Sequence, residues 1–348
     1  MSLSRVFCLI FTLALAAGLS LEGCRRQERP EGTPEEWYQD ARSMEEQGLY
    51  FKEERENAPL GALEYYQWCL AEGRFDDSIT REIRHRIAWY SALKLLLTEE
   101  FMSKADYRGA IEAMTGFRDQ WPDSPYRALA LFYRGLAKEY DIDFQDTAGA
   151  IEDYRQFIAE NPDHALVPEA WSRIGHCWEF NLDSADYAKA IAVYDRLIET
   201  YGPTNEVVRR PDTPELVRMC VERALYNKAR ILEDYLAETD DAEKARNCYA
   251  RAVECYGRLT DPVFFGAARF KQAQFVHYRY GCLLAERLGK VDEGLAALEQ
   301  MAQRWRESPW YGRVQWRMKQ IRERTGRPAA TPAAPGGDAD RRDERDKS

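Results

Sequence analysis

The chain has 348 residues, of which 45% are hydrophobic and 12% aromatic, so it is long enough to bury a sizeable core. Its formal net charge of −10 provides no electrostatic footprint for nucleic acid, and no long basic run indicates binding to anionic lipid head groups. Few segments alternate as strands do, so the pattern predicts an all-α fold.

The chain begins with an apolar segment. Arg5 precedes the uncharged run VFCLIFTLALAAGLSL, which ends at Leu21, and Glu22, Gly23 and Cys24 follow it. The run is too short to favour a stable membrane span and is typical of a secretory signal peptide. We therefore expect residues 1–23 to be a signal peptide.

The Leu-x-Gly-Cys ending resembles the lipobox of bacterial lipoproteins, whose cysteine is diacylglycerylated and becomes the mature N-terminus. The resemblance implies a stable anchor of several acyl chains on Cys24. Arg25 follows the cysteine, and by analogy with that family it favours the periplasmic face of the outer membrane. The alternatives are cleavage near residues 16–18, which would release a soluble periplasmic protein, and an uncleaved anchor. The polar residues 24–33 are expected to form a tether.

Three central segments repeat one pattern every 40 residues. They read GAIEAMTGFRDQWPD, GAIEDYRQFIAENPD and KAIAVYDRLIETYGP, and they place alanines at Ala110, Ala150 and Ala190. Bulky residues follow each alanine by four and seven positions, with Tyr154 and Tyr194 among them, and a proline follows by twelve or thirteen. These offsets lie on one face of a helix that the proline ends. We expect close helix contacts at these positions.

Another helix is predicted between the second and third segments, where Trp171, Ile174, Gly175 and Trp178 fall at offsets 0, 3, 4 and 7. Together these helices resemble the tetratricopeptide repeat, or TPR, whose first helix carries W-x₂-L-G-x₂-Y and whose second carries alanine, a bulky residue and proline. The resemblance implies a TPR-like α-solenoid, a right-handed superhelix of antiparallel helix pairs.

The period is 40 residues, whereas the usual TPR period is 34. HEAT repeats have periods near 40, but the residue pattern favours TPR; a non-repeating helical bundle is the other alternative. Weaker copies on both sides, around Ala62, Ala252 and Gly294, extend the prediction to about five to six helix pairs over residues 34–324. Residues 325–348 contain no large apolar side chain, and we expect them to form a disordered tail.

The chemistry-bearing residues indicate no enzyme. No HExxH motif, glycine-rich phosphate loop or GxSxG elbow occurs, so the sequence predicts no catalytic, metal-binding or cofactor-binding residues. The cysteines beyond Cys24 form no CxxC pair and lie among apolar residues, which favours packing roles, although a long-range disulfide stays open. They are Cys69, Cys177, Cys220, Cys248, Cys255 and Cys282.

A groove lined by the first helices is the predicted binding site, because stacked repeats present a concave surface to partners. The candidate groove residues lie on predicted first helices and are Arg127, Arg134, Lys138, Arg173 and His176.

A lipobox followed by long-period repeats, with the helix ends PDSPY and NPDH, resembles the BamD-like family of TPR lipoproteins, which belong to the bacterial β-barrel assembly machinery. That resemblance implies a scaffold in outer-membrane protein assembly, with other envelope proteins or extended peptide segments as partners. The alternatives are a pilotin-like or polysaccharide-export TPR lipoprotein that serves another envelope machine, and a regulator of a cell-wall enzyme.

Overall fold

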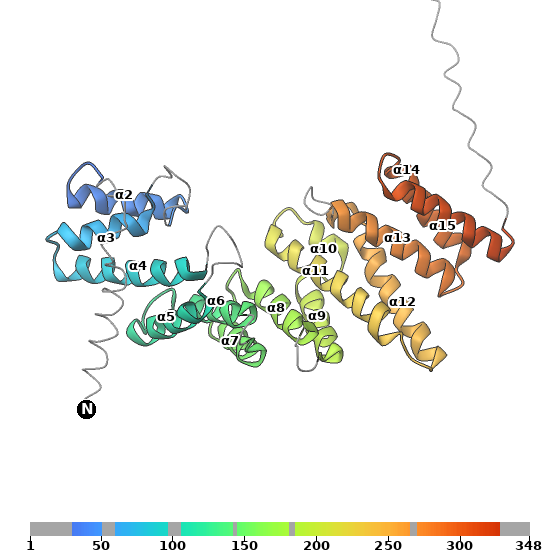
Figure 1. Cartoon of the computed structure of the whole chain (residues 1–348), viewed down its shortest axis with the longest axis horizontal. Helices are drawn as coiled ribbons and strands as arrows, with labels where there is room; N and C mark the ends of the chain where they lie inside the picture. Colours follow the sequence, from blue (N-terminus) through green and yellow to red (C-terminus); the bar gives the residue numbers. More distant parts are fainter. Residues whose placement is uncertain are drawn as a thin grey trace, which may run out of the picture. The chain divides into compact units, whose positions relative to one another are not determined.

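The computed structural model describes residues 30–50, 60–96, 106–141, 145–180, 185–264 and 270–327. Cys24, the expected signal peptide and residues 328–348 of the expected tail lie outside the described residues. The chain divides into two compact units, Met1–Asp141 and Ile142–Ser348. Every regular element in the described ranges is helical, so the chain is an all-α, TPR-like solenoid whose helices pack in series within each unit (Figure 1).

In the first unit, helix α2 (Pro34–Glu46) packs on α3 (Ala62–Glu72), and α3 packs on α4 (Asp77–Leu96). Helix α5 (Tyr107–Gln120) then lies against α4, and α6 (Arg127–Tyr140) lies against α5. Side chains from neighbouring helices, such as Trp37, Tyr66 and Met114, share one hydrophobic core. Each helix therefore buries its apolar face mainly on its neighbours in sequence, as a repeat array requires.

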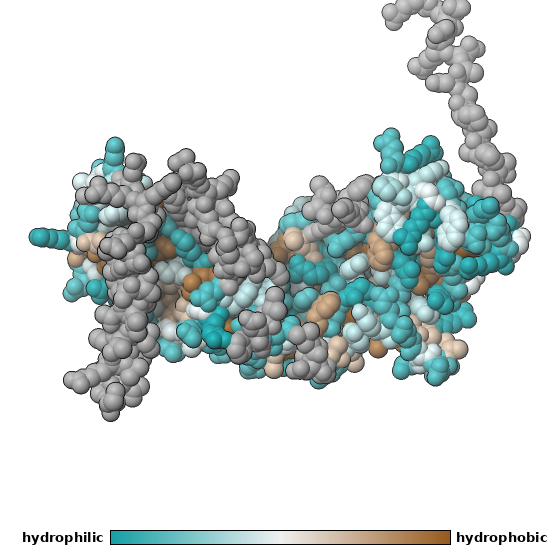
Figure 2. All heavy atoms as spheres, viewed as in Figure 1, coloured by the Kyte–Doolittle hydropathy of each residue, from teal (hydrophilic) through white to brown (hydrophobic). Residues whose placement is uncertain are grey.

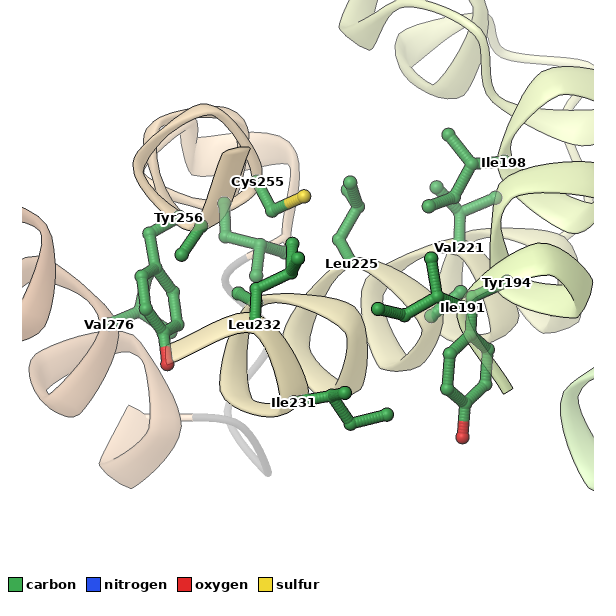
Figure 3. Packing of buried hydrophobic residues seen from close by; sticks show 14 of the residues in the cluster. Ile191, Tyr194, Ile198, Val221, Leu225, Ile231, Leu232, Cys255, Tyr256 and Val276 are labelled. Carbon is green, nitrogen blue, oxygen red and sulfur yellow. The ribbon is translucent and has the colours of Figure 1, made fainter. Parts of the chain in front are cut away.

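The second unit continues with α7 (Thr147–Glu160), α8 (Val167–Phe180), α9 (Tyr187–Tyr201) and the short α10 (Asn205–Arg209). Helix α11 (Glu215–Ile231) runs directly into the π-helical segment η1 (Leu232–Leu236), and α12 (Ala242–Leu259) and the 3₁₀ turn η2 (Pro262–Phe264) follow. The unit ends with α13 (Phe270–Glu286), α14 (Val291–Arg304) and α15 (Trp310–Thr325). Figure 3 shows the core in which α9, α11 and α12 place Tyr194, Leu225 and Tyr256.

The 40-residue period has a local cause at the helix starts. Helices α5, α7 and α9 begin at residues 107, 147 and 187, directly after the N-cap residues Asp106, Asp146 and Asp186. Each N-cap carboxylate accepts a hydrogen bond from the backbone N–H three residues later, at 2.8–2.9 Å. Such caps satisfy an N–H that has no partner within the helix, so each repeat specifies where its second helix begins.

The face drawn in Figure 2 is mostly hydrophilic, with scattered apolar residues. Among the described helices, none combines the length and the apolarity that a membrane span needs.

Candidate functional site

An open cavity of about 520 Å³ lies in the second unit, where α8, α11 and α13 face one another. These three helices are the first helices of successive helix pairs. Its lining combines apolar, cationic and amide side chains, including Phe180, Met219, Arg223, Tyr226, Asn227 and Arg230. Phe180 is 47% exposed and Met219 is 38% exposed, although both are large apolar residues. Exposed apolar groups beside fixed polar groups are typical of a binding surface.

Helix α11 forms the floor of the cavity because of its residue pattern. Met219, Arg223, Tyr226 and Arg230 fall at offsets 0, 4, 7 and 11, so they lie along one stripe of the helix. A neighbouring stripe is buried and holds small and apolar residues, namely Cys220, Ala224 and Leu225 among others. The helix is therefore fixed by packing on one side and presents its second stripe to the cavity.

A buried carboxylate holds Arg230 in place. Glu179, at the end of α8, forms an ion pair with Arg230, and only 1% of the Glu179 side chain is exposed. Tyr194 donates its hydroxyl hydrogen bond to Glu179 Oε2 at 3.1 Å, and Asn227 Nδ2 donates to the Tyr194 hydroxyl oxygen at 3.1 Å. Because a buried charge must be paired and hydrogen-bonded, this network fixes the guanidinium at the cavity wall.

A second carboxylate, Glu169 near the start of α8, holds Arg223. Arg223 Nη1 donates to Glu169 Oε1 at 2.9 Å, and Arg173 Nε donates to the same oxygen at 2.9 Å. Burial raises the pKa of Glu169, but the Arg223 and Arg173 charges outweigh burial, so the net pKa lies below its ordinary value. The carboxylate is therefore ionised at neutral pH.

The same type of pairing recurs between other successive helix pairs. Glu233 of η1 pairs with Arg279 of α13 and accepts a hydrogen bond from Tyr256 at 3.1 Å. In the first unit, Glu45 of α2 forms an ion pair with Arg86 of α4, with Oε1 and Nη1 3.2 Å apart. A glutamate of one pair thus meets an arginine of the next pair at three interfaces.

The packing positions predicted from the repeat lie inside the protein. Ala110, Ala150 and Ala190 have no exposed surface, and neither do Tyr154 and Tyr194. Gly175 is also buried, and a β-carbon added there would lie 2.4 Å from Tyr194 Cε1. The glycine therefore makes room for the tyrosine ring.

The two tryptophans of the α8 pattern are only partly buried. Both pack against the core of the second unit, and each carries a cation over its ring. Arg196 lies 4.3 Å from the centroid of Trp171, and Lys189 lies 4.3 Å from that of Trp178.

The five candidate groove residues fall in both units. His176 lines the cavity, and its ring centroid lies 4.5 Å from that of Phe180. Arg173 does not line the cavity but shares Glu169 with Arg223. The other three lie on α6 of the first unit; they are Arg127, Arg134 and Lys138. Arg134 donates a hydrogen bond to Thr115 Oγ1 at 3.2 Å, which ties it to α5.

A smaller open cavity of about 280 Å³ lies in the first unit, between the start of α4 and the turn after α5. His85 Nε2 lies 2.7 Å from Ser124 Oγ there, and the Arg81 guanidinium lies 5.8 Å from the centroid of Trp121. Burial lowers the pKa of His85, and the nearby Arg86 charge adds to this effect. The lining of this smaller cavity includes no exposed large apolar side chain, so the cavity of the second unit is the stronger candidate for binding.

The cysteines of the described ranges are six buried thiols that no disulfide joins. Burial raises the pKa of Cys69 and of Cys255 to about 11, so both thiols are protonated at neutral pH. Within those same ranges, no group of three or more His, Cys, Asp or Glu side chains is arranged to hold a metal ion.

Sequence reasoning missed the glutamate–arginine pairs and the exposed Phe180 and Met219. The pairs escape a search for a fixed period because the insertion of α10 and the π-helical segment alters the spacing. Tyr194 and Tyr256 have the same role but are 62 residues apart. A glutamate at the end of a first helix, followed by an arginine in the next first helix, is the signal that would have found them.

Residues 129–164 match the family model of a tetratricopeptide repeat. This segment includes most of α6 and all of α7, and so covers one first helix and one second helix of the pattern. None of the curated proteins matches the chain. One segment of the chain therefore matches a tetratricopeptide repeat, and it lies within a TPR-like array of serially packed helices.

Proposed function

We propose that this chain is an adaptor that holds an extended segment of another protein in the cavity between α8, α11 and α13. TPR proteins are typically scaffolds for protein–protein interactions, and stacked first helices are the surface they use. The observation that carries the proposal is the exposure of Phe180 and Met219 beside two fixed guanidiniums. Large apolar anchors next to oriented polar groups are typical of peptide-binding surfaces.

We further propose that the adaptor works in the bacterial envelope, anchored to the periplasmic face of the outer membrane through a lipid on Cys24. The lipobox-like ending Leu21–Cys24 supports this location, and the resemblance to the BamD-like family supports a role in outer-membrane protein assembly. In that role the bound segment belongs to another component of the assembly machinery or to an unfolded outer-membrane protein.

Site-specific crosslinking in a bacterial host tests the adaptor role. A photoreactive amino acid replaces Met219 in the full chain, and a matched variant carries it at Glu199, an exposed position on the second helix α9. We expect Met219 to capture a defined envelope protein that Glu199 does not capture, and Phe180→Asp to abolish that capture. Equal capture at both positions, or no capture at either, would refute the proposed site.

The identity of the captured protein tests the finer role. Components of the barrel-assembly machinery or unfolded outer-membrane proteins support the proposal, whereas a secretin or a cell-wall enzyme contradicts it. Cys24→Ala tests the anchor by membrane fractionation. The variant should lose its acyl label and leave the outer membrane, and an unchanged distribution would argue against lipidation.

A further inference from the structure

We propose that the cavity of the second unit selects an internal peptide segment in which two acidic residues, about three positions apart, flank a large apolar residue. The inference rests on the proposed adaptor function and names the chemistry of its partner. It follows from the spacing of the two guanidiniums, from the place of their counter-charges and from the apolar surface beside them.

The spacing of the two guanidiniums calls for two anionic groups. Arg223 and Arg230 lie seven residues apart on the cavity stripe of α11, which separates their backbones by about 10 Å along the helix. Each guanidinium is held by a different glutamate, and Glu169 and Glu179 lie ten residues apart on α8, so a single carboxylate does not bridge both arginines. An extended peptide advances about 3.3 Å per residue, so two acidic residues three positions apart span the same length.

The counter-charges of both arginines lie behind the cavity surface. Glu169 and Glu179 are buried, whereas 35% of the Arg223 side chain and 21% of the Arg230 side chain are exposed. The cavity lining carries two guanidiniums, those of Arg223 and Arg230, and one carboxylate, that of Glu222. A ligand therefore meets the two guanidiniums before it meets their buried counter-charges.

The guanidiniums are also oriented before any ligand arrives. Arg223 Nη1 contacts both Glu169 oxygens, at 2.9 and 3.1 Å, and Ser172 Oγ at 3.3 Å. Arg230 is paired with Glu179, which Tyr194 holds by its hydroxyl. A planar guanidinium fixed in this way loses little side-chain entropy when its remaining N–H groups bind a carboxylate.

An apolar contact surface lies beside the arginines. The Arg230 guanidinium lies 5.5 Å from the centroid of Phe180, which leaves the ring partly open to solvent. Met219 occupies the same stripe as Arg223, one turn earlier. A flexible methionine and an exposed ring accommodate a leucine-sized or aromatic side chain of varied shape.

Fluorescence anisotropy with short labelled peptides and the full chain tests this inference. The first peptide carries two aspartates three positions apart with leucine between them, and its C-terminus is amidated. The second replaces both aspartates with asparagine and the third replaces them with lysine. The fourth is the second peptide shortened to end at the leucine, whose C-terminal carboxylate is free. We expect the first peptide to bind at least about tenfold more tightly than the others, since each charge-assisted contact contributes about a factor of ten or more.

Variants of the chain assign the effect to its residues. Arg223→Gln and Arg230→Gln should each weaken binding of the first peptide about tenfold, and Glu222→Gln should strengthen it. Arg251→Gln removes an arginine on α12, outside the cavity lining, and should leave binding unchanged. Circular dichroism and thermal melting show whether each variant is folded.

Glu179 acts as a positioning residue, so its test needs a readout beyond affinity alone. Glu179→Gln should weaken binding of the dicarboxylate peptide but not of the asparagine peptide, because the glutamine amide oxygen still accepts the Tyr194 hydrogen bond but no longer pairs with Arg230. Equal losses for both peptides would indicate a merely structural role.

The outcomes separate this inference from the adaptor role. Equal binding of the dicarboxylate and asparagine peptides overturns the inference, as does preference for the lysine peptide or for the free carboxylate. Binding that survives both arginine substitutions also overturns it. In each case the adaptor function still stands if crosslinking at Met219 captures a partner, and it fails if crosslinking captures none.

Discussion

Replacing Gly175 with alanine should destabilise the protein, although alanine usually favours a helix. The added β-carbon would lie 2.4 Å from Tyr194 Cε1 and 2.8 Å from Cδ1 and Cζ. Carbon atoms in favourable contact are about 3.5–4.0 Å apart, so the ring must move by about 1 Å or more. The ring cannot move alone, because its hydroxyl group is hydrogen-bonded to Glu179 and Asn227.

The magnitude follows from three contributions. Overpacking a buried site costs about 1–3 kcal/mol. Weakening hydrogen bonds to the buried Glu179 carboxylate costs about 1–3 kcal/mol more. The higher helix propensity of alanine returns about 1 kcal/mol. We therefore expect Gly175→Ala to lower the free energy of unfolding by about 1–5 kcal/mol.

Gly312 provides the matched control, since it lies in α15 of the same unit and no atom lies within 4 Å of its added β-carbon. Gly312→Ala should stabilise the protein by about 0.5–1 kcal/mol. Urea unfolding followed by far-ultraviolet circular dichroism measures both variants. If Gly175→Ala matched or exceeded the stability of Gly312→Ala, the close contact with Tyr194 would be refuted.

Three further predictions concern stability and reactivity. Tyr194→Phe should cost about 1–3 kcal/mol in urea unfolding, because Glu179 and Asn227 lose a buried partner; an unchanged midpoint would contradict the network. The pKa of Glu169 is lowered in the folded state, so its stabilisation is complete above its ordinary pKa of 4.5 and is lost as the pH falls below it. Glu169→Gln should therefore flatten the fall in thermal stability below pH 4.5, and an unaltered slope would count against the ion pairs. Burial raises the pKa of Cys69 and Cys255 to about 11, so a thiol reagent at pH 8 should label them only after denaturation; rapid labelling of the native protein would show that they are accessible.

The repeat itself could be predicted from the sequence because its causes are local. Asp146 caps α7, Ala150 allows a close contact, and Tyr154 fills the core, and all three lie within nine residues. Such short-range signals survive in a single sequence. They sufficed to place Ala110, Ala150 and Ala190 at helix contacts and to predict an all-α TPR-like fold.

The cavity could not be predicted in the same way, because it depends on contacts between residues far apart in sequence. Arg223 and Glu169 are 54 residues apart, and their pairing needs the inserted α10 to be placed correctly. A first-helix position predicts a face of the helix but not how deep a side chain lies. His176 was therefore found at the cavity, whereas Arg134 is tied to Thr115 in the other unit.

The glutamate–arginine pairs bear on how such an array can lengthen or shorten during evolution. In the second unit, a glutamate of one helix pair binds an arginine of the next helix pair, as Glu179 binds Arg230 and Glu233 binds Arg279. Removing the helix pair α11–α12 would therefore bring Glu179 opposite Arg279, with charges still matched. At the C-terminal end of this series, Glu286 of α13 forms an ion pair with Arg317 of α15, with Oε2 and Nη2 2.5 Å apart. Helix α15 therefore caps the array. A truncation before Trp310 would leave the Glu286 carboxylate without Arg317, whereas duplication or deletion of a whole helix pair before α13 would not.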